Sequence, residues 1–255
     1  MAGTTVGVLH PGEMGAAVGA VLRECGHRVV WASEGRSEAT RARAAASGLE
    51  DAGSIEAVAG SEFVFSICPP HAALEVAGRL GSFGGVYVDA NAVAPATAAK
   101  VASLVGRFVD GGIVGSPPRE AGSTRLYLSG DEAPAVAELF AGSVLDARVV
   151  SSASAVKMVY AGWTKGSTAL LLAIRELARR EGVEETLLEE WAMSIPDLPE
   201  RSERAARSAD AKGWRWVGEM EEIAATFAAA GQPDGFHAAA AEVYRQAPRA
   251  DSRLR

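Results

Sequence analysis

The feature that most constrains the fold is the stretch Thr4–Gly19, TTVGVLHPGEMGAAVG, in which an apolar run breaks into a glycine-bearing turn and then into small residues. This order predicts a strand, a tight turn and the start of a helix. The free N–H groups and positive dipole end of such a helix hold a pyrophosphate in dinucleotide-binding folds. We therefore expect a cofactor site at this turn, formed by His10, Pro11, Gly12, Glu13 and Met14.

The turn departs from the G-x-G-x-x-G fingerprint at one position. Gly12 and Gly15 match its second and third glycines, whereas His10 stands where the first glycine is usual. The second glycine lets the backbone approach a phosphate, and the third lets the helix pack closely on the strand. We therefore expect the turn to admit a phosphate and to let the helix pack closely on the strand. His10 would either contact the cofactor or fill the turn.

Strand and helix signals alternate through the first 150 residues, which predicts an α/β fold with a Rossmann-type doubly wound sheet. The expected strands are Arg28–Ala32, Phe63–Ile67, Val86–Asp89, Leu126–Ser129 and Ala147–Val150. The first helix is expected over Gly15–Glu24, and the glycine-dense segment Gly111–Pro118 is expected to be a turn.

The pattern changes after residue 151. Ala153–Glu181 predicts one long helix, and shorter helices are expected over Glu184–Met193, Pro199–Ala211, Trp214–Ala230 and Gly235–Gln246. We therefore predict a Rossmann domain over residues 1–150 and a smaller, all-α substrate and dimerisation domain over residues 151–255. Apolar residues surround much of the long helix, which suggests a homodimer in which each long helix meets its twin.

Composition excludes several classes of partner. A net charge of −7 argues against nucleic acid, because neutralising phosphates requires a basic surface. No apolar run approaches the roughly 18 residues that span a bilayer, and the N-terminus lacks signal-peptide features. The two cysteines, Cys25 and Cys68, lack metal-ligand or CxxC spacing. We expect a cytoplasmic protein with a small-molecule substrate and no metal site.

The residues after the second predicted strand bear on cofactor choice. An acidic side chain there binds the ribose hydroxyls of NAD, whereas an arginine accommodates the 2′-phosphate of NADP. Ser33 stands near the acidic position, and Arg36 and Ser37 supply a guanidinium and a hydroxyl. This combination favours NADP, although Glu34 keeps NAD possible and a solvated Arg36 is the simpler alternative.

Other cofactor contacts are expected where strands end, because open α/β sheets hold ligands at the carboxyl ends of their strands. The residues at these positions are Cys68, Pro69, Pro70 and Asn91.

Three segments together resemble the β-hydroxyacid dehydrogenase and 6-phosphogluconate dehydrogenase superfamily, in particular a branch with a helical C-terminal domain of undefined function. Gly12–Gly15 matches its Gly-x-Met-Gly turn, Asp110–Ser116 corresponds loosely to its substrate loop, and Lys157 takes the position of its catalytic lysine. The resemblance runs through nearly the whole chain. It implies an NAD(P)-dependent dehydrogenase or reductase but does not identify the substrate.

The resemblance also implies roles for residues around the lysine. Lys157 would move the proton of the substrate hydroxyl, with Gly115, Ser116 and Thr164 binding the substrate. The family usually carries an asparagine about one turn after the lysine, where this chain has Tyr160 and Ala161. Tyr160 could replace it as a donor, could itself supply the proton, or could be a core aromatic. Lys165, farther along the helix, is expected to be a solvated charge.

Three functions remain open at this point. The first is NADP-dependent oxidation or reduction of a small polar substrate resembling a 3-hydroxy acid. The second is reduction of an imine, because Glu221 and Glu222 stand near the place of a Lys-Asp pair in the family and would suit an amine. An ordinary solvated acidic face is the simpler explanation of these residues. The third is cofactor binding without turnover.

Overall fold

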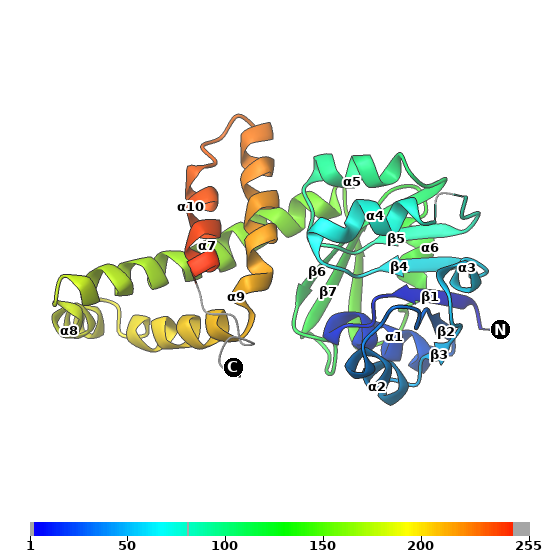
Figure 1. The fold of residues 1–255 in the computed structure, drawn as a ribbon, viewed down its shortest axis with the longest axis horizontal. Coiled ribbons are helices and arrows are strands. Elements are labelled where there is room, and N and C mark those ends of the chain that lie inside the picture. Colours follow the sequence, from blue (N-terminus) through cyan, green and yellow to red (C-terminus); the bar gives the residue numbers. More distant parts are fainter. Residues whose placement is uncertain (1–2, 81, 247–255) are drawn as a thin grey trace. The chain divides into compact units, whose positions relative to one another are not determined.

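The computed structural model describes residues 3–80 and 82–246 (Figure 1). The chain divides into two compact units, residues 1–157 and 158–255. The longest predicted helix begins in the first unit and continues in the second. The predicted domain boundary lies near this division, at residue 151, and the last nine residues of the predicted helical domain, 247–255, lie outside the described part.

Eight strands of the described residues form one sheet in the order β3-β2-β1-β4-β5-β6-β7-β8. All neighbours pair in parallel except β6 and β7, which are antiparallel. The strands are β1 Thr5–Leu9, β2 Arg28–Trp31, β3 Glu50–Asp51, β4 Phe63–Ser66, β5 Val86–Asp89, β6 Arg107–Gly115, β7 Thr124–Ser129 and β8 Leu145–Val149. The Rossmann-type doubly wound sheet expected from the sequence is therefore confirmed.

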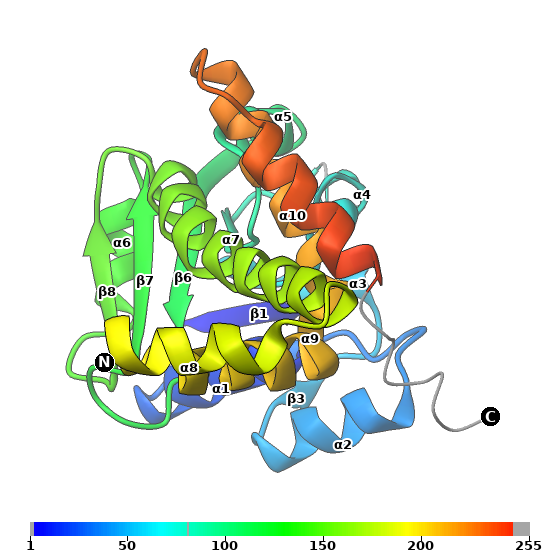
Figure 2. The same cartoon turned by 90° about the vertical axis from the view of Figure 1, so that its left-hand side faces the viewer.

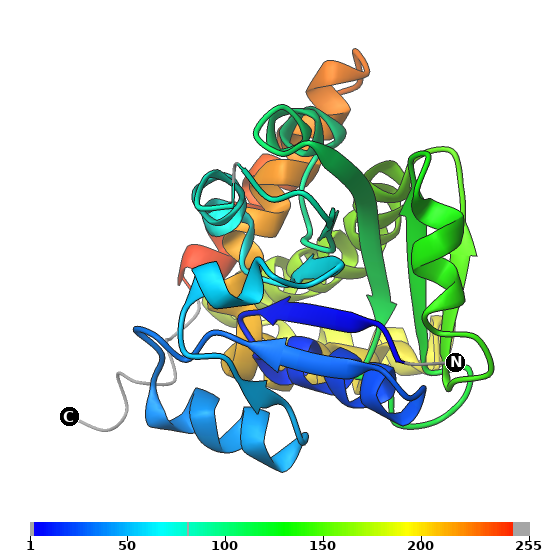
Figure 3. The same cartoon turned by 90° about the vertical axis from the view of Figure 1, so that its right-hand side faces the viewer.

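Helices cover both faces of this sheet (Figures 1 and 3). One apolar core lies between the sheet and α1, α2 and α6, and a second lies between the sheet and α3, α4 and α5. Strands that are buried on both faces of a sheet have continuous apolar sequences, as the central strands do here. The helices are α1 Glu13–Glu24, α2 Glu38–Ala46, α3 Ile55–Val58, α4 Ala73–Gly78, α5 Pro95–Ala102 and α6 Ala133–Glu138, with a 3₁₀ turn, η1, at Pro70–Ala72.

The order of the strands reverses at β1. From β1 the chain builds outward through β2 and β3, then returns to the other side of β1 with β4. In open α/β sheets such a reversal leaves a crevice outside the carboxyl ends of the two central strands. The register pairs Leu9 with Ser66, so the turn that begins at His10 lies beside Ile67 and Cys68.

The predicted turn over Gly111–Pro118 is wrong for its first five residues, which belong to β6 and pair with β7. The glycines serve close packing rather than bending. A Cβ on Gly111 would lie 2.8 Å from the carbonyl oxygen of Asp89, and one on Gly112 would lie 2.8 Å from that of Ala153. A side chain at Gly111 would therefore displace the Asp89–Ala90 backbone, and one at Gly112 would displace the start of α7.

The described residues of the second unit form α-helices and the turns that join them, as predicted (Figure 2). Its helices are α7 Ala153–Arg180, which starts in the first unit, α8 Glu184–Ser194, α9 Leu198–Ala229 and α10 Gly235–Gln246. The two helices predicted over Pro199–Ala211 and Trp214–Ala230 are one continuous helix, α9. Gly213 lies between the two predicted ranges and is buried within α9, where packing offsets its low helix propensity, roughly 1 kcal/mol below alanine.

Helices α9 and α10 lie side by side and are joined by specific contacts (Figures 1 and 2). The rings of Trp216 and Tyr244 meet edge to face with centroids 5.1 Å apart. The Tyr244 hydroxyl donates to the carbonyl oxygen of Lys165 on α7 over 2.6 Å. None of the helices in the described ranges is long and apolar enough to cross a membrane.

Candidate functional site

The turn between β1 and α1 has an unusual backbone. His10 is the one residue other than glycine, within the described ranges, that has a positive φ, at 65°. A left-handed conformation costs a residue with a Cβ about 1–2 kcal/mol, which explains why glycine is usual at this position. The Gly12 N–H donates to the His10 carbonyl oxygen over 2.7 Å, which closes the turn just before α1.

The two glycines of the turn have different surroundings. A Cβ built on Gly15 would lie 2.7 Å from the His10 carbonyl oxygen, so glycine is needed there for α1 to approach the turn. A Cβ built on Gly12 would meet nothing within 4 Å. The second fingerprint position thus faces open space at the N-terminus of α1, where a phosphate would approach.

His10 is neutral at physiological pH. Burial, reinforced by the positive charges of Arg36 and Arg79, lowers the pKa of its imidazole to about 4. Its Nδ1 atom is buried and has no hydrogen-bond partner among the described residues. The turn therefore presents an uncharged ring beside two guanidinium groups.

Arg36 is more than a solvated loop arginine. Its Nε atom is buried, and no hydrogen-bond partner for it is found in the described ranges. Burial, and then the charge of Arg79, lower the pKa of Arg36. Arg79 is also paired with Glu34 over 3.8 Å, so Arg36 is the guanidinium group that an anionic ligand would neutralise. Arg79 lies at the end of α4, far from the motif in sequence, so sequence analysis missed it.

Ser33 and Ser37 mainly shape the loop that carries Arg36. The buried Ser33 accepts, at its carbonyl oxygen, a 2.9 Å hydrogen bond from Arg41 Nη2. Ser37 caps α2, because its hydroxyl oxygen accepts from the Thr40 N–H over 3.3 Å. This is the capping role that serine commonly fills at a helix N-terminus.

Asn91 and Cys68 lie together at the carboxyl ends of β4 and β5. Asn91 is buried, and its Oδ1 accepts from the Cys68 N–H over 2.5 Å while its Nδ2 donates to Ser66 Oγ over 3.1 Å. These two hydrogen bonds of Asn91 hold in place the start of the loop that continues with Pro69 and Pro70. Burial raises the pKa of the Cys68 thiol to about 11, which keeps it protonated.

The start of α7 is fixed by side chains of the sheet. Asp110 Oδ2 accepts hydrogen bonds from the Ser154 N–H and the Ser154 hydroxyl, each over 2.9 Å. It also accepts from the Ser129 hydroxyl, and Ser129 in turn accepts from the Ala153 N–H over 2.9 Å. Free helix N–H groups favour negative charge, so a carboxylate suits this place. Sequence analysis assigned no such role to Asp110, Ser129 or Ser154.

This cap sets the position of Lys157, one turn into α7. Lys157 Nζ donates to the carbonyl oxygen of Ile113 on β6 over 2.9 Å, and Lys157 Cβ lies 3.0 Å from where a Gly112 Cβ would be. Because Gly112 has no side chain, the turn of α7 that carries Lys157 can pack closely against β6. Gly115 ends this strand, and the carbonyl oxygen of the following residue, Ser116, accepts from the Thr124 hydroxyl.

Farther along α7 the structure decides between earlier alternatives. Tyr160 is 45% exposed, so it is not a core aromatic. The prediction that Lys165 is a solvated charge is wrong, because its side chain is only 17% exposed and forms an ion pair with Glu219. Thr164 lies on the same helix, and its hydroxyl donates to the Tyr160 carbonyl oxygen over 3.3 Å. Glu221 is exposed and paired with Arg245, which fits the solvated-face interpretation.

No group of three or more histidine, cysteine, aspartate or glutamate side chains is placed to hold a metal ion in the described ranges.

Two family models match the chain. Residues 5–93 match "NADP oxidoreductase coenzyme F420-dependent", and residues 178–247 match "Domain of unknown function (DUF1932)". A curated relative from Methanothermus fervidus, an uncharacterized 28.5 kDa protein, is 32% identical over 163 residues. That match covers 61% of this chain and 64% of the relative, so the chain spans less than two thirds of that relative's length.

Solved structures extend the likeness to the full chain. The conserved protein MTH1747 of unknown function, described as structurally similar to 3-hydroxyacid dehydrogenases, is 31% identical, with 98% of each chain covered and a TM-score of 0.70. The 3-hydroxyisobutyrate dehydrogenase of Mycobacterium tuberculosis is 18% identical over 96% of this chain and 93% of its own, with a TM-score of 0.67. At 18% identity the likeness shows the fold alone.

A reductive aminase from Aspergillus terreus, solved with NADPH, is likewise similar in fold, at 19% identity over 96% of this chain and 93% of its own, with a TM-score of 0.59. With the full-length likeness to MTH1747 and the two family models, the chain belongs to the β-hydroxyacid dehydrogenase and 6-phosphogluconate dehydrogenase superfamily of NAD(P)-dependent oxidoreductases, in the branch with a helical C-terminal domain of unknown function.

Proposed function

We propose that the protein transfers a hydride between NADP and a small polar substrate, with Lys157 as the general acid and base. The observation that carries this proposal is the pair of features at the β1–α1 turn. The turn has open space at Gly12, and the Arg36 guanidinium nearby has a buried nitrogen with no partner in the described ranges. The superfamily's cofactor would occupy the open space at Gly12 and would neutralise the Arg36 guanidinium.

The residues at the turn fit a dinucleotide. The N–H groups at the start of α1 would hold its diphosphate, with Pro11, Glu13 and Met14 around them. Arg36 would pair with a 2′-phosphate, which NADP carries and NAD lacks, and Ser33 and Ser37 would line the same loop. Cys68, Pro69, Pro70 and Asn91 would border the nicotinamide side. The bound nicotinamide would supply or accept the hydride.

Lys157 is the proposed proton carrier, because hydride transfer at a C–OH carbon requires a group that moves the hydroxyl proton. Its ammonium group donates to the carbonyl oxygen of Ile113, which holds it beside the strand that leads to Gly115 and Ser116. Tyr160, exposed one turn farther on, would orient the substrate where the family usually has asparagine. Gly115, Ser116 and Thr164 remain proposed substrate contacts.

Reduction of a C=N bond is the second candidate, suggested by the fold shared with a reductive aminase. The sequence argument for an amine substrate depends on Glu221 and Glu222. Glu221 is exposed and already paired with Arg245, which weakens this second candidate. We therefore favour an alcohol or carbonyl substrate resembling a 3-hydroxy acid. Turnover of a panel of 3-hydroxy acids, measured beside a panel of cyclic and acyclic imines, separates the two enzymatic functions.

A third candidate is cofactor binding without turnover. It would be favoured if NADPH bound while no member of either panel reacted. Activity that disappears in Lys157→Met, while NADPH still binds, would instead support the catalytic proposal.

The proposed enzyme is a homodimer. Several apolar side chains of α7 are 60–70% exposed, namely Val159, Trp163, Leu170 and Leu177. The last three recur every seven residues, so they form one stripe that a second copy could cover. Light scattering should give twice the 26.3 kDa chain mass, and Leu170→Glu should reduce it to a monomer. A monomeric mass for the unmodified chain would remove this proposal.

A further inference from the structure

The loop after β2 carries two side chains that would favour different cofactors. Glu34 and Arg36 are two residues apart, and both follow the strand at its carboxyl end. In dinucleotide-binding folds an acidic side chain at this place binds the ribose hydroxyls of NAD, whereas an arginine accommodates the 2′-phosphate of NADP. The loop alone therefore does not decide between the two nucleotides.

The backbone holds both side chains in one turn. The Arg36 N–H donates to the Ser33 carbonyl oxygen over 3.1 Å, and Gly35, between the two charged residues, has a positive φ of 67°. The Glu34 N–H donates to the Gly53 carbonyl oxygen over 2.9 Å, which ties the turn to the segment after β3. These bonds fix the backbone at Glu34, so the interactions of Glu34 with a ligand depend on what its side chain contacts.

Arg79, from a distant part of the sequence, contacts the Glu34 carboxylate. It lies at the C-terminal end of α4, and its Nη2 is 3.8 Å from Glu34 Oε2. After burial, the charge of Arg79 lowers the pKa of Arg36. After burial and the charge of Arg36, it also lowers the pKa of His10. Arg79 therefore belongs to the group of charges at the proposed cofactor site.

A second carboxylate, Glu56 on α3, is coupled to Arg79 more weakly. Hydrogen bonds from its own backbone N–H and from Ser54 lower the pKa of Glu56, and the charge of Arg79 makes a smaller contribution in the same direction. Glu34 is therefore the carboxylate whose interactions Arg79 is best placed to control.

The pairing of Glu34 with Arg79 has opposite consequences for the two cofactors. A 2′-phosphate carries a charge of about −1.5 to −2 at pH 7, as other phosphate monoesters do. A carboxylate without a cation beside it would repel that phosphate and would accept hydrogen bonds from ribose hydroxyls. A guanidinium beside the carboxylate opposes both effects.

We propose that Arg79 sets the cofactor preference by holding Glu34, so that the loop accepts a 2′-phosphate at Arg36 and does not bind the ribose hydroxyls of NAD. Arg79 is then a specificity-determining residue that acts through Glu34. This inference rests on the proposed function, because it concerns the same NADP site. The Arg79 and Glu34 side chains are 44% and 61% exposed, and exposed ion pairs contribute little to stability, so variants of either residue should fold.

Fluorescence titrations with NADPH and with NADH test the proposal through the ratio of the two affinities. Arg79→Gln should lower the preference for NADPH by about fivefold, because NADPH binds more weakly and NADH more tightly. Arg79→Lys, which keeps the positive charge, should retain most of the preference. When Glu34→Gln is already present, adding Arg79→Gln should change the ratio by less than about twofold, because no carboxylate remains to be held.

Two single variants serve as matched controls, and both should leave the ratio unchanged. Arg28→Gln removes the arginine of another exposed ion pair, with Glu50, at the opposite end of β2. Glu56→Gln removes the second carboxylate near Arg79.

The titrations separate failure of this inference from failure of the proposed function. If the unmodified chain prefers NADPH and Arg79→Gln keeps that preference, only the role of Arg79 is overturned. The same holds if the effect of Arg79→Gln persists in full without Glu34, because the guanidinium would then act on the phosphate directly. If the unmodified chain binds neither nucleotide, or binds NADH more tightly, both proposals are overturned.

Discussion

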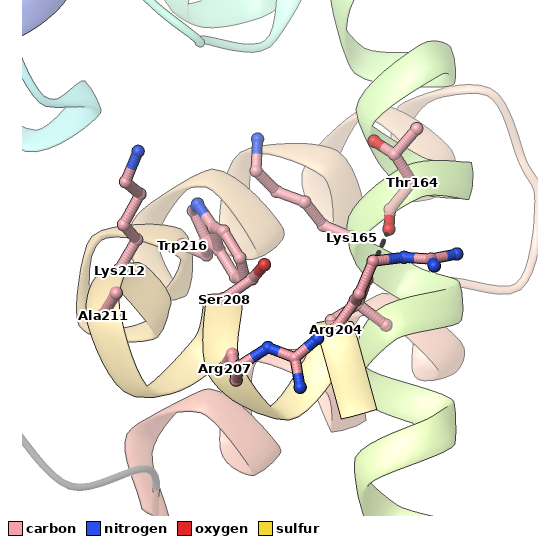
Figure 4. A pocket seen from close by; sticks show the side chains of 9 residues that line it. Thr164, Lys165, Arg204, Arg207, Ser208, Ala211, Lys212 and Trp216 are labelled. Atoms are coloured by element: carbon pink, nitrogen blue, oxygen red, sulfur yellow. Dashed lines mark hydrogen bonds between the residues drawn. The ribbon is translucent and has the colours of Figure 1, made fainter. Parts of the chain in front are cut away.

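The turn between β1 and α1 and the pocket between α7 and α9 are built differently. At the turn, backbone geometry decides the site: a left-handed His10, an open Gly12 and a Gly15 with no room for a side chain. The pocket is instead lined by side chains from two helices, α7 and α9, four of which are lysine or arginine (Figure 4). Backbone-built sites require particular residues at fixed spacing, whereas side-chain sites tolerate many arrangements. Only the first kind leaves a motif that can be found in a sequence.

The largest effect expected separates chemistry from cofactor binding. Lys157→Met should reduce turnover by about 10²–10⁴-fold, the range typical of a general acid or base, while NADPH affinity changes little. Steady-state rates and a fluorescence titration with NADPH measure the two quantities. Lys100→Met, on the outer surface of α5, serves as the charge-matched control. Full turnover in Lys157→Met would refute the proposed proton transfer.

The two glycines of the turn should respond in opposite ways. Gly12→Ala should fold with a stability within about 1 kcal/mol of the unmodified chain, because its Cβ meets nothing. It should nevertheless bind NADPH at least tenfold more weakly, a cost of about 1.4 kcal/mol. Gly15→Ala should lose about 1–3 kcal/mol of stability through the clash with the His10 carbonyl. Urea unfolding and NADPH titration of both variants check this. Equal behaviour of the two would contradict the assigned roles.

The cap of α7 tests how firmly the sheet holds the lysine-bearing turn. Asp110→Ala removes the acceptor of three hydrogen bonds and should cost about 2–3 kcal/mol, since buried donors are left unpaired. Asp110→Asn, which keeps one carbonyl oxygen, should cost less. Denaturant melts give both values. If Asp110→Ala were as stable as the unmodified chain, the cap would have no structural role.

The smallest effect concerns His10 and pH. Its pKa is about 4 in the folded protein and about 6.5 when unfolded, so the unfolded chain binds more protons between these values. The stabilisation from the neutral ring is complete above pH 6.5 and is lost as the pH falls toward 4. In His10→Asn, which tolerates the left-handed backbone without titrating, urea melts should show a weaker loss between pH 7 and 5. An unchanged pH dependence would contradict the low pKa.

The sequence could predict the parts of the molecule that depend on local patterns. Apolar runs marked the central strands, and glycine spacing marked the turn between β1 and α1. The long helix starting at Ala153 followed from its uninterrupted helical composition, as the structure shows. These features depend on contacts between residues close together in the chain.

What the sequence could not predict depends on contacts between distant residues. Gly111 and Gly112 suggested a turn because glycine permits bending, yet they lie in a strand where α7 and the Asp89–Ala90 backbone leave no space for side chains. Lys165 suggested a solvated charge until Glu219, 54 residues later, was placed beside it. Arg79 was missed for the same reason: nothing near it in sequence links it to Arg36.

Titration of the purified chain with NADPH and with NADH is the most direct test of the central claim, that the turn from His10 to Glu13 holds the diphosphate of NADP. We predict that NADPH binds at least tenfold more tightly than NADH, and that Arg36→Gln removes this preference while leaving NADH affinity unchanged. Failure of both nucleotides to bind, or tighter binding of NADH, would contradict the claim.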